Sequence, residues 1–456
     1  MFDDINPATQ QMPVMLILPM PLVSALERYF EFERLRTNWR TEVLAGFTTF
    51  ITMAYIIEVN PSILHEAGMP FEAVLAATCI SAAIGSILMG AFARYPIALA
   101  PGMGLNAYFT YSVVNGLGIP WQVAPGAVFV SGVAFLILTA IGVRKMIFSA
   151  IPQDLYGAVA VGIGLFIAFI GLRNSGIIVA NSATLVGLGD LRAANTLLSI
   201  FGLLLTAGLY ARGIRAAMLI GILTTTAVGA VAGLLRWAPQ ASALSELPRT
   251  AFQLDVPRAL GLGIVEVVFV FLFVDLFDNV GTLVAVGKKA GLFEHGNQIA
   301  RLNRILTCDA TATVVGSVTG TSTVVSYIES AAGVVAGGRS GVTSIVVGLL
   351  FLVALFVAPV AGAIPSSATA PALIIVGSLM MSHVTEIQWT DPTIALSSFL
   401  TILAIPLTFS IANGLAFGFT AYTLMRMIRG EFREINWVVY ALTALFLLRF
   451  VYLSHH

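Results

Sequence analysis

The chain has 456 residues, of which 58% are hydrophobic and 10% charged, and its formal net charge is zero. A soluble chain carries about 25% charged residues, so this composition excludes an ordinary soluble domain and predicts an all-α polytopic membrane protein. The balanced charge gives no reason to expect a nucleic-acid partner. Cys79 and Cys308 fall in or beside apolar segments, so no disulfide framework is expected.

Residues 1–40 are expected to form an arm outside the membrane. The apolar run 13–26 is short and contains three prolines, so it fits neither a signal peptide nor a membrane span. Several arginines precede the first long apolar run, and basic residues favour the cytoplasmic side. They are Arg28, Arg34, Arg36 and Arg40. We therefore expect a multi-pass protein of the cell membrane with its N-terminus in the cytoplasm.

Two sets of apolar segments follow the arm, and a polar segment at 236–258 separates them. At about 20 residues per span, the first set falls at about 42–59, 73–93, 97–114, 122–143, 151–172, 195–211 and 214–235. The second set falls at about 260–286, 303–319, 321–337, 341–360, 366–382, 393–409 and 411–429. Seven spans per half would insert the two halves with opposite topology, which predicts an inverted repeat. Whether 437–453 is a further span or an interfacial helix stays open.

The third apolar segment of each half contains residues that interrupt a helix. Pro96, Pro101, Gly102 and Gly104 predict a short extended piece and then a helix starting near Gly104. In the second half, a second short extended piece is expected in the tenth span, with the polar run 319–323 preceding a helix that contains Glu329. Interrupted segments at matching positions of two halves indicate a transporter binding site. The backbone N–H groups of Gly104 and of Thr321, Ser322 and Thr323 are expected to face the substrate.

Acidic residues inside apolar spans are the strongest functional signal. Asp275 and Asp278 are three residues apart and share one helical face, which Asn279 widens. Burial and mutual repulsion disfavour the charged form of at least one acid, which suits proton coupling. Glu329 is a third acid of this kind. A purely structural role for each acid, holding a broken backbone, remains the alternative.

Other polar residues give weaker signals. The Asn106 amide could donate to and accept from a planar heterocycle, or it could cap a helix. Tyr108, Phe109 and Phe273 could stack on a flat ligand, although packing accounts for them equally well. Glu58 is interpreted as an acid at the membrane interface. The five histidines show no ligand spacing, so neither a metal site nor a cofactor is predicted.

Four long blocks resemble the AzgA-type adenine/guanine/hypoxanthine permeases, one branch of the nucleobase:cation symporters. The blocks are GFTTFITMAYIIEVNPSIL (46–64), PIALAPGMGLNAYFTYSVV (96–114), VDLFDNVGTLVAVG (274–287) and GTSTVVSYIESAAGVVAGGRSGVTSIVVGLLF (320–351). The resemblance covers the chain from residue 40 to about residue 430. It implies a fold like that of the uracil permease, with a core domain (41–145 and 259–363) and a gate domain (146–258 and 364–456).

The resemblance also implies a function and a set of roles. The function would be proton symport of purine bases by an elevator or rocking movement, without enzymatic chemistry and with a homodimer left open. Asp275 and Glu329 resemble the family's substrate-binding and coupling acids, Asp278 a second acid of the eighth span, and Asn106 its binding asparagine. Asn279 stands where Thr is expected and Glu58 where an apolar residue is expected. Either departure could alter substrate preference or proton coupling.

Four alternatives to this function are weighed. The same architecture could carry another nucleobase, such as xanthine or uracil. A small-anion carrier would present basic charge at the site, and the third, eighth and tenth spans hold no Lys or Arg at mid-depth. A passive channel needs no titratable pair. An intramembrane aspartyl enzyme would place its two acids on separate helices, as Asp275 and Glu329 would be.

Overall fold

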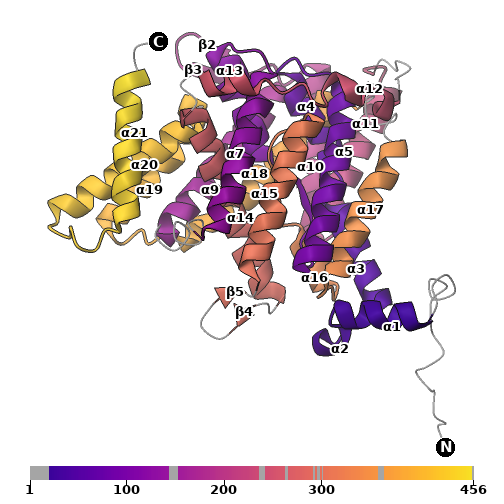
Figure 1. Ribbon diagram of the computed structural model, residues 1–456. Coiled ribbons are helices and arrows are strands. Elements are labelled where there is room, and N and C mark those ends of the chain that lie inside the picture. The colour runs from indigo at the N-terminus through magenta and orange to yellow at the C-terminus, as the bar shows by residue number, and fades with distance from the viewer. Residues whose placement is uncertain are drawn as a thin grey trace, which may run out of the picture.

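The computed structural model describes residues 20–142, 152–235, 242–261, 265–290, 293–294, 298–299, 301–357 and 364–453. Most of these residues form helices that run between two opposite faces of the molecule (Figure 1). One face holds the N-terminal arm, α1 (Met20–Tyr29) and α2 (Phe32–Leu35), and is called the arm face below. The other face holds Glu66 and is called the Glu66 face.

The first half of the chain contributes two long helical elements, a broken element and four further helices. The first helical element is α3 (Trp39–Met53) with α4 (Ile56–His65), and the second is α5 (Phe71–Leu88) with the π-helical η3 (Met89–Ala93). The broken element consists of β1 (Leu99–Pro101), α6 (Met103–Ala107) and the π-helical η4 (Tyr108–Asn115). Then come α7 (Val123–Ala140), α9 (Gln153–Asn174), the hairpin β2 (Ile178–Asn181) and β3 (Leu185–Leu188), α10 (Ala194–Ala211) and α11 (Ala217–Val231).

The second half begins after short helical pieces, α12 (Ala243–Glu246), η5 (Leu247–Arg249) and α13 (Val256–Gly261). It continues with α14 (Val265–Ala290), the small hairpin β4 (Phe293–Glu294) and β5 (Gln298–Ile299), α15 (Leu302–Thr319), β6 (Val324–Ser326), α16 (Ser330–Val335) and α17 (Gly341–Val357). The last elements are α18 (Ser366–Met380) with the 3₁₀ turn η7 (Met381–Glu386), α19 (Pro392–Thr408), α20 (Ile411–Ile428) and α21 (Trp437–Leu453).

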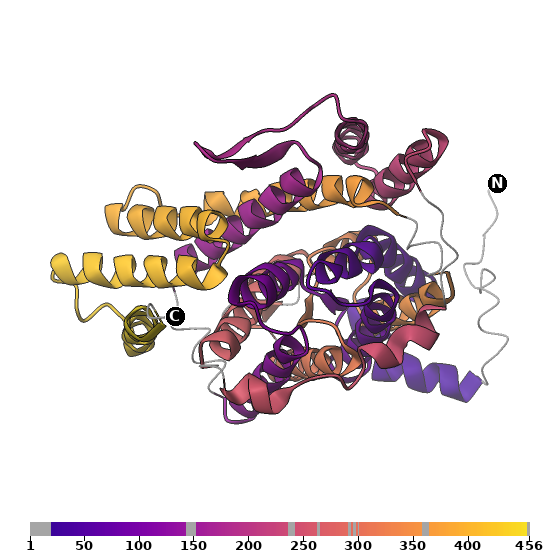
Figure 2. The same ribbon diagram turned by 90° about the horizontal axis from the view of Figure 1, so that it is seen from above.

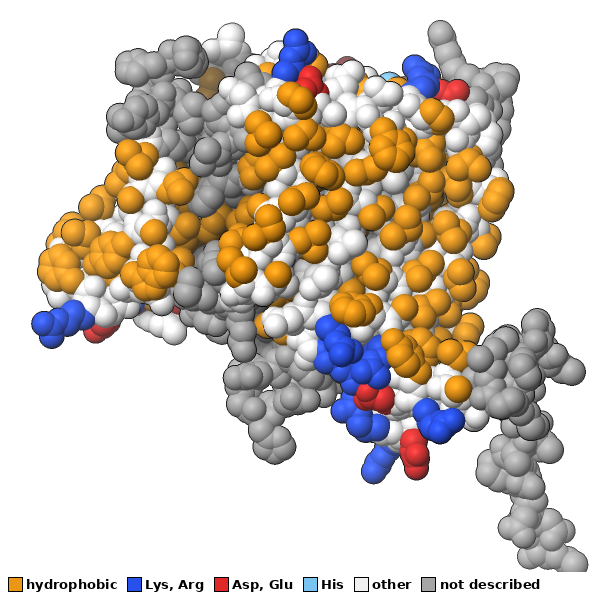
Figure 3. All heavy atoms as spheres, in the orientation of Figure 1, with side chains coloured by type: hydrophobic (Ala, Val, Ile, Leu, Met, Phe, Trp, Pro, Cys, Tyr) orange, Lys and Arg blue, Asp and Glu red, His pale blue; other side chains and the backbone are white. Residues whose placement is uncertain are grey.

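The surface is that of a membrane protein. Figure 3 shows a wide band of hydrophobic side chains, with charged side chains gathered at the two ends. Within the described residues, six helices are long and apolar enough to cross a membrane. They are 39–65, 71–93, 123–140, 154–174, 194–211 and 366–386. The other expected spans are not among these six, so the fourteen spans and the inverted repeat stay predictions.

The helices fall into two groups, which Figure 2 shows from above. In one group α17 packs against α5 and α3, and α15 packs against α7 and α5. In the other, α9 packs against α18 and α19, and α10 packs against α11 and α18. Gly164 and Gly377 bring α9 and α18 into backbone contact, because a Cβ on Gly377 would lie 2.3 Å from the Gly164 carbonyl oxygen. Contacts of α9 with α6 and α14 join the groups.

The two broken elements pair with each other at the centre of the first group. Strands β1 and β6 are antiparallel, with Leu99 opposite Ser326 and Pro101 opposite Val324. The Gly102 N–H donates to the Thr323 carbonyl at 3.0 Å, and the Tyr327 N–H donates to the Ala98 carbonyl at 2.9 Å. Unpaired backbone groups are costly inside a membrane, and this pairing supplies their partners. Extended pieces therefore lie in both segments where the sequence predicts them.

The arm is fixed to the arm face through Glu31. Its carboxylate forms ion pairs with Arg301, Arg34 and Arg94, the last at 3.1 Å. Burial alone would raise the pKa of Glu31, but the three guanidinium groups outweigh it and lower this pKa below its usual range. The Tyr29 hydroxyl also donates to the Ala91 carbonyl at 2.7 Å. The arm thus holds together two segments, near residues 94 and 301, that are distant in sequence.

A buried carboxylate orders the start of α17. Glu42, in the first turn of α3, accepts from the N–H groups of Arg339 and Ser340 at 3.0 and 3.1 Å and from the Thr343 hydroxyl at 2.6 Å. Anionic groups stabilise helix N-termini. Since α16 ends at Val335 and α17 begins at Gly341, Glu42 also fixes the loop that follows α16.

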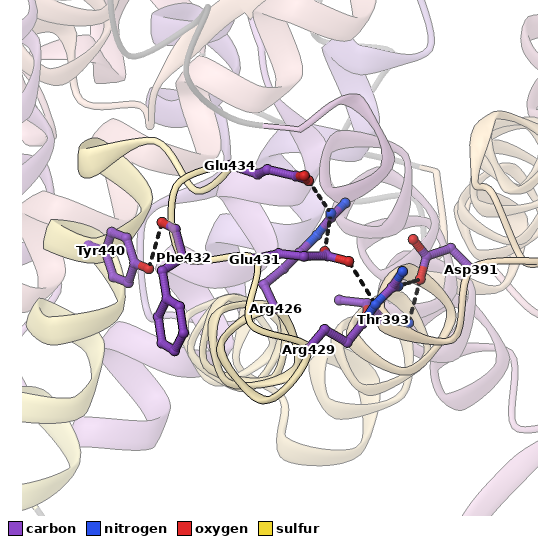
Figure 4. Close-up of polar contacts among 8 residues, drawn as sticks. All are labelled: Asp391, Thr393, Arg426, Arg429, Glu431, Phe432, Glu434 and Tyr440. Atoms are coloured by element: carbon purple, nitrogen blue, oxygen red, sulfur yellow. Dashed lines mark hydrogen bonds and ion pairs between the residues drawn. The ribbon is translucent and has the colours of Figure 1, made fainter.

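A second polar cluster joins α19, α20 and α21 (Figure 4). Arg429 pairs with Asp391 at 2.8 Å, and Arg426 pairs with Glu434 at 3.0 Å. A hydrogen bond from the Thr393 N–H, together with Arg429, lowers the pKa of Asp391 below its usual range. Beyond this cluster, α21 runs antiparallel to α20, with Thr443 bonded to Thr423 and Phe446 packed on Phe419. In this structure α21 stands alongside the bundle and does not lie across its end (Figure 1).

Candidate functional site

A cavity of about 110 Å³ lies between the paired strands and the second group of helices. From the first group it is lined by the Gly102–Gly104 turn, by Thr282 on α14 and by residues 325–329. From the second group it is lined by residues of α9, α18 and η7. A Cβ on Gly102 would lie 2.8 Å from Val325 Cγ2, so a larger residue there would press on β6. The broken elements therefore form one wall of the cavity and unbroken helices form the other.

Glu329 is the acidic side chain that lines this cavity among the described residues. It does not lie within a helix, as the sequence analysis expected, but directly before α16, which begins at Ser330. The prediction was wrong because β6 and a turn separate the polar run 319–323 from the helix. The Tyr55 hydroxyl, at the junction of α3 and α4, donates to Glu329 Oε1 at 2.6 Å. This length is typical of a hydroxyl bonded to a carboxylate.

Asp275 reaches the cavity wall through Asn279. Both side chains are buried on α14. Asn279 Nδ2 donates to Asp275 Oδ1 at 2.7 Å, while Asn279 Oδ1 accepts from the Ser326 N–H at 3.1 Å. Ser326 lines the cavity and Asp275 does not. Asn279 thus ties a buried carboxylate to the strand that faces the cavity, and the side chain of Asp278 lies outside the described residues.

The other predicted binding residues form a separate buried cluster behind the strands. Asn106 Oδ1 accepts from the Ser322 hydroxyl, and Asn60 Nδ2 donates to Thr321 Oγ1 at 2.8 Å. Thr321, Ser322 and Thr323 precede β6, not a helix, so their N–H groups do not form a helix N-terminus at the cavity. Asn106 Nδ2 has no hydrogen-bond partner among the described residues. In this conformation the cluster lies apart from the cavity.

Several lining residues and one hydrogen-bond partner of Glu329 were missed by sequence reasoning. Thr282 lies seven residues after Asp275 and three after Asn279, so all three share one face of the helix. This spacing could have identified Thr282 from the sequence. Tyr55 carried no local signal, because its contact with Glu329 joins distant segments. His383 was not among the predicted site residues, but it lies in η7 and lines the cavity.

Glu58 was also misplaced by the sequence analysis. It was interpreted as an interface acid because the first span was expected to end at residue 59. The helical element continues to His65, so Glu58 is buried within it and accepts from Ser62 at 3.2 Å.

A second cavity, of about 820 Å³, lies on the Glu66 face between α4 and α18. Its lining includes Glu66, Glu72 and Thr369. At its edge Arg173 Nη2, from the end of α9, bonds Glu66 Oε2 at 2.6 Å, and Asn174 Nδ2 bonds Glu66 Oε1 at 2.9 Å. Glu66, just beyond α4, therefore joins the two helix groups at this face. Since α4 and α9 both end here, α9 must begin at the arm face.

Comparisons with known proteins agree on a family. The model of the Permease family matches residues 40–418. Adenine permease AdeP of Escherichia coli (strain K12) is 44% identical over 431 residues, which cover 94% of this chain and 97% of AdeP. Guanine/hypoxanthine permease PbuG of Bacillus subtilis (strain 168) is 44% identical over 441 residues, which cover 94% of this chain and all of PbuG.

A solved structure agrees on the fold. The transmembrane domain of the cyanobacterial bicarbonate transporter BicA superposes with a TM-score of 0.65, at 16% identity, over 81% of this chain and 96% of that domain. At this identity the likeness concerns the fold alone. The family match and the two permeases above confirm the resemblance that the sequence blocks indicated: the chain belongs to the permease family of nucleobase transporters and is an integral membrane transporter, not an enzyme.

Proposed function

We propose that the chain takes up purine bases into the cell together with protons. The names of its relatives, an adenine permease and a guanine/hypoxanthine permease, support the substrate class. The cavity adds physical support, because about 110 Å³ is well below the roughly 300–1,000 Å³ of pockets for drug-sized ligands. A free base fits such a space better than a nucleoside or nucleotide.

The site binds the base through its own oxygen and nitrogen atoms. Glu329 accepts ring or exocyclic N–H groups, and the backbone near Gly104 donates to acceptor atoms on the base. The described residues that line the cavity include neither Lys nor Arg, which argues against a small-anion substrate. Tyr55, bonded to Glu329, fixes the carboxylate before the base arrives.

The position of Glu329 on the cavity wall supports proton coupling. A carboxylate that loses water when the base closes over it is costly unless it is paired or protonated. Binding a neutral base therefore favours the protonated carrier. Release of the base and the proton on the cytoplasmic side completes the cycle. Asp275 and Asp278 are proposed to take part, Asp275 through Asn279.

The two helix groups are proposed to act as the core domain (41–145 and 259–363) and the gate domain (146–258 and 364–456). The cavity lies between them, and Glu66 with Arg173 links them at one face. Movement of the core against the gate would expose the site alternately at the two faces. The arginines at the arm face, including Arg94 and Arg301, support a cytoplasmic arm in the plasma membrane.

The deciding experiment measures radiolabelled hypoxanthine and adenine uptake in cells that lack their own purine permeases. Wild-type protein should concentrate the base in a protonophore-sensitive way. Glu329→Gln should lose concentrative uptake and keep some exchange of internal for external base, since its amide keeps the size but cannot cycle a proton. Glu72→Gln, the same exchange at an acid that lines the second cavity instead, serves as a matched control. Full accumulation by Glu329→Gln would contradict the coupling role, and the absence of any wild-type purine uptake would contradict the function.

A further inference from the structure

The gate-side wall of the cavity is apolar except at one position. Its lining residues on α9 are Ala160, Ile163 and Ile167, and those on α18 are Val376 and Met380. The remaining lining residue on this side is His383, in η7. Among the described residues, His383 is thus the side chain of this wall that can form a strong hydrogen bond with a ligand.

The position of His383 is firmly set by its surroundings. The Gln388 N–H, just beyond η7, donates to Asp154 Oδ1 at the start of α9 at 2.8 Å. A Cβ on Gly157 would lie 3.1 Å from the His383 carbonyl oxygen, so η7 and α9 are in close contact. Because α9 begins at the arm face, His383 lies at the arm-face end of the cavity wall.

The imidazole is also oriented by a neighbour. His383 Nδ1 lies 3.3 Å from Glu386 Oε1, one turn further along η7, and its side chain is 16% exposed. A carboxylate at this distance favours the tautomer with hydrogen on Nδ1. In that tautomer Nε2 remains as a hydrogen-bond acceptor.

A purine has polar atoms around both of its fused rings. When Glu329 and the Gly104 backbone bind one edge, the opposite edge faces α9 and α18, whose lining side chains offer it no hydrogen bond. A polar group buried without a partner weakens binding, and sites that pair such a group discriminate strongly against ligands that lack it. A one-ring base that leaves the far end of the same cavity empty would gain nothing from an acceptor there.

We propose that His383 contacts the substrate and determines specificity, because its Nε2 accepts an N–H from the far edge of a two-ring base. The residue thereby favours purines over pyrimidines. This inference rests on the proposed function and adds a gate-side contact to the site. Glu386 acts as a positioning residue that orients the imidazole.

The test compares hypoxanthine and uracil as competitors of labelled hypoxanthine uptake. His383→Leu should lower the apparent affinity for hypoxanthine about tenfold, which corresponds to about 1.4 kcal/mol. It should change the apparent affinity for uracil less than twofold. The purine preference therefore falls about tenfold. Glu386→Ala should lower the apparent affinity for hypoxanthine two- to threefold. Ser382→Ala, at the exposed residue before His383 that does not line the cavity, should leave both values within twofold of the wild type.

The outcomes separate the inference from the proposed function. If the wild type takes up no purine, the function itself fails. If the wild type works and His383→Leu keeps its purine preference, or weakens both bases equally, the specificity role is overturned. If His383→Leu does not reach the membrane, His383→Asn, which stays polar but is too short to reach the base, is expected to give the same loss and is judged by the same rule.

Discussion

The contact of Glu66 with Arg173 and Asn174 yields a prediction about the conformational equilibrium. It joins the end of α4 in the first helix group to the end of α9 in the second, at the Glu66 face. If this face opens to admit substrate, the contact of Glu66 with Arg173 and Asn174 has to break. Replacing Glu66 with alanine should therefore shift the carrier toward the state that is open at the Glu66 face.

The size of the shift follows from exposure. The Arg173 and Glu66 side chains are 39% and 35% exposed, so solvent screens the pair and its contribution is close to the roughly 0.2–1 kcal/mol of exposed ion pairs. The Asn174 amide bond adds a second contact to the same carboxylate. A total of about 1 kcal/mol changes the ratio of closed to open carriers about fivefold.

The assay measures how fast an impermeant thiol reagent reaches a cysteine placed at Thr369, which is buried and lines the second cavity from α18. The cysteine should be labelled about five times faster in Glu66→Ala than in the protein with Glu66. High salt should reduce this difference in labelling rate. Glu72→Gln is the control, because it removes an acid from the same cavity and leaves the ion pair intact. Equal labelling rates with and without Glu66, or no coupling between Glu66→Ala and Arg173→Gln in a double-mutant cycle, would refute the reasoning.

Two further predictions concern polar contacts elsewhere. Asn279→Ala should raise the half-saturation concentration for purine about tenfold, measured by uptake kinetics, because the Ser326 N–H and Asp275 lose a buried partner; an unchanged value would remove Asn279 from the site. The pKa of Glu31 is lowered, so its ion pairs should hold the arm in place at pH values above the ordinary glutamate pKa of about 4.3. The arm should be released as the pH falls below that value. Amide exchange in residues 20–36, corrected for intrinsic rates, should rise at low pH in the wild type and already at pH 7 in Glu31→Gln; equal protection in both proteins at pH 7 would contradict this.

Local sequence signals were sufficient to locate the broken elements. Pro101 and Gly102 cannot continue a helix, and the run 319–323 is too polar for a lipid-facing one, so both interruptions were visible from composition and conformational preference. The pairing of β1 with β6 was not visible, since it joins residue 99 to residue 326 and depends on how the helices pack. That pairing moved Glu329 out of the expected helix and took Thr321–Thr323 away from the cavity.

Residues whose roles depend on neighbouring helices were harder to predict. His383 follows the last apolar residues of its span and resembles a loop residue, and only the contact of η7 with the start of α9 turns it toward the cavity. Asn279 was recognised as a departure from an expected Thr, but its two bonds could not be inferred without the position of β6.

The two acids that the sequence analysis treated alike occupy different positions, and the difference suggests how a proton would act on the substrate site in the proposed cycle. Glu329 lines the cavity, whereas Asp275 is buried behind it and acts on the wall only through Asn279. The hydrogen bond from the Asn279 amide to Asp275 is charge-assisted when Asp275 is ionised, and such bonds are stronger than bonds between neutral groups. Protonation of Asp275 should loosen Asn279 and with it the Ser326 N–H of β6. Because β6 is paired with β1, a proton on α14 can alter the strand that lines the cavity and its partner strand, even though Asp275 itself does not line the cavity.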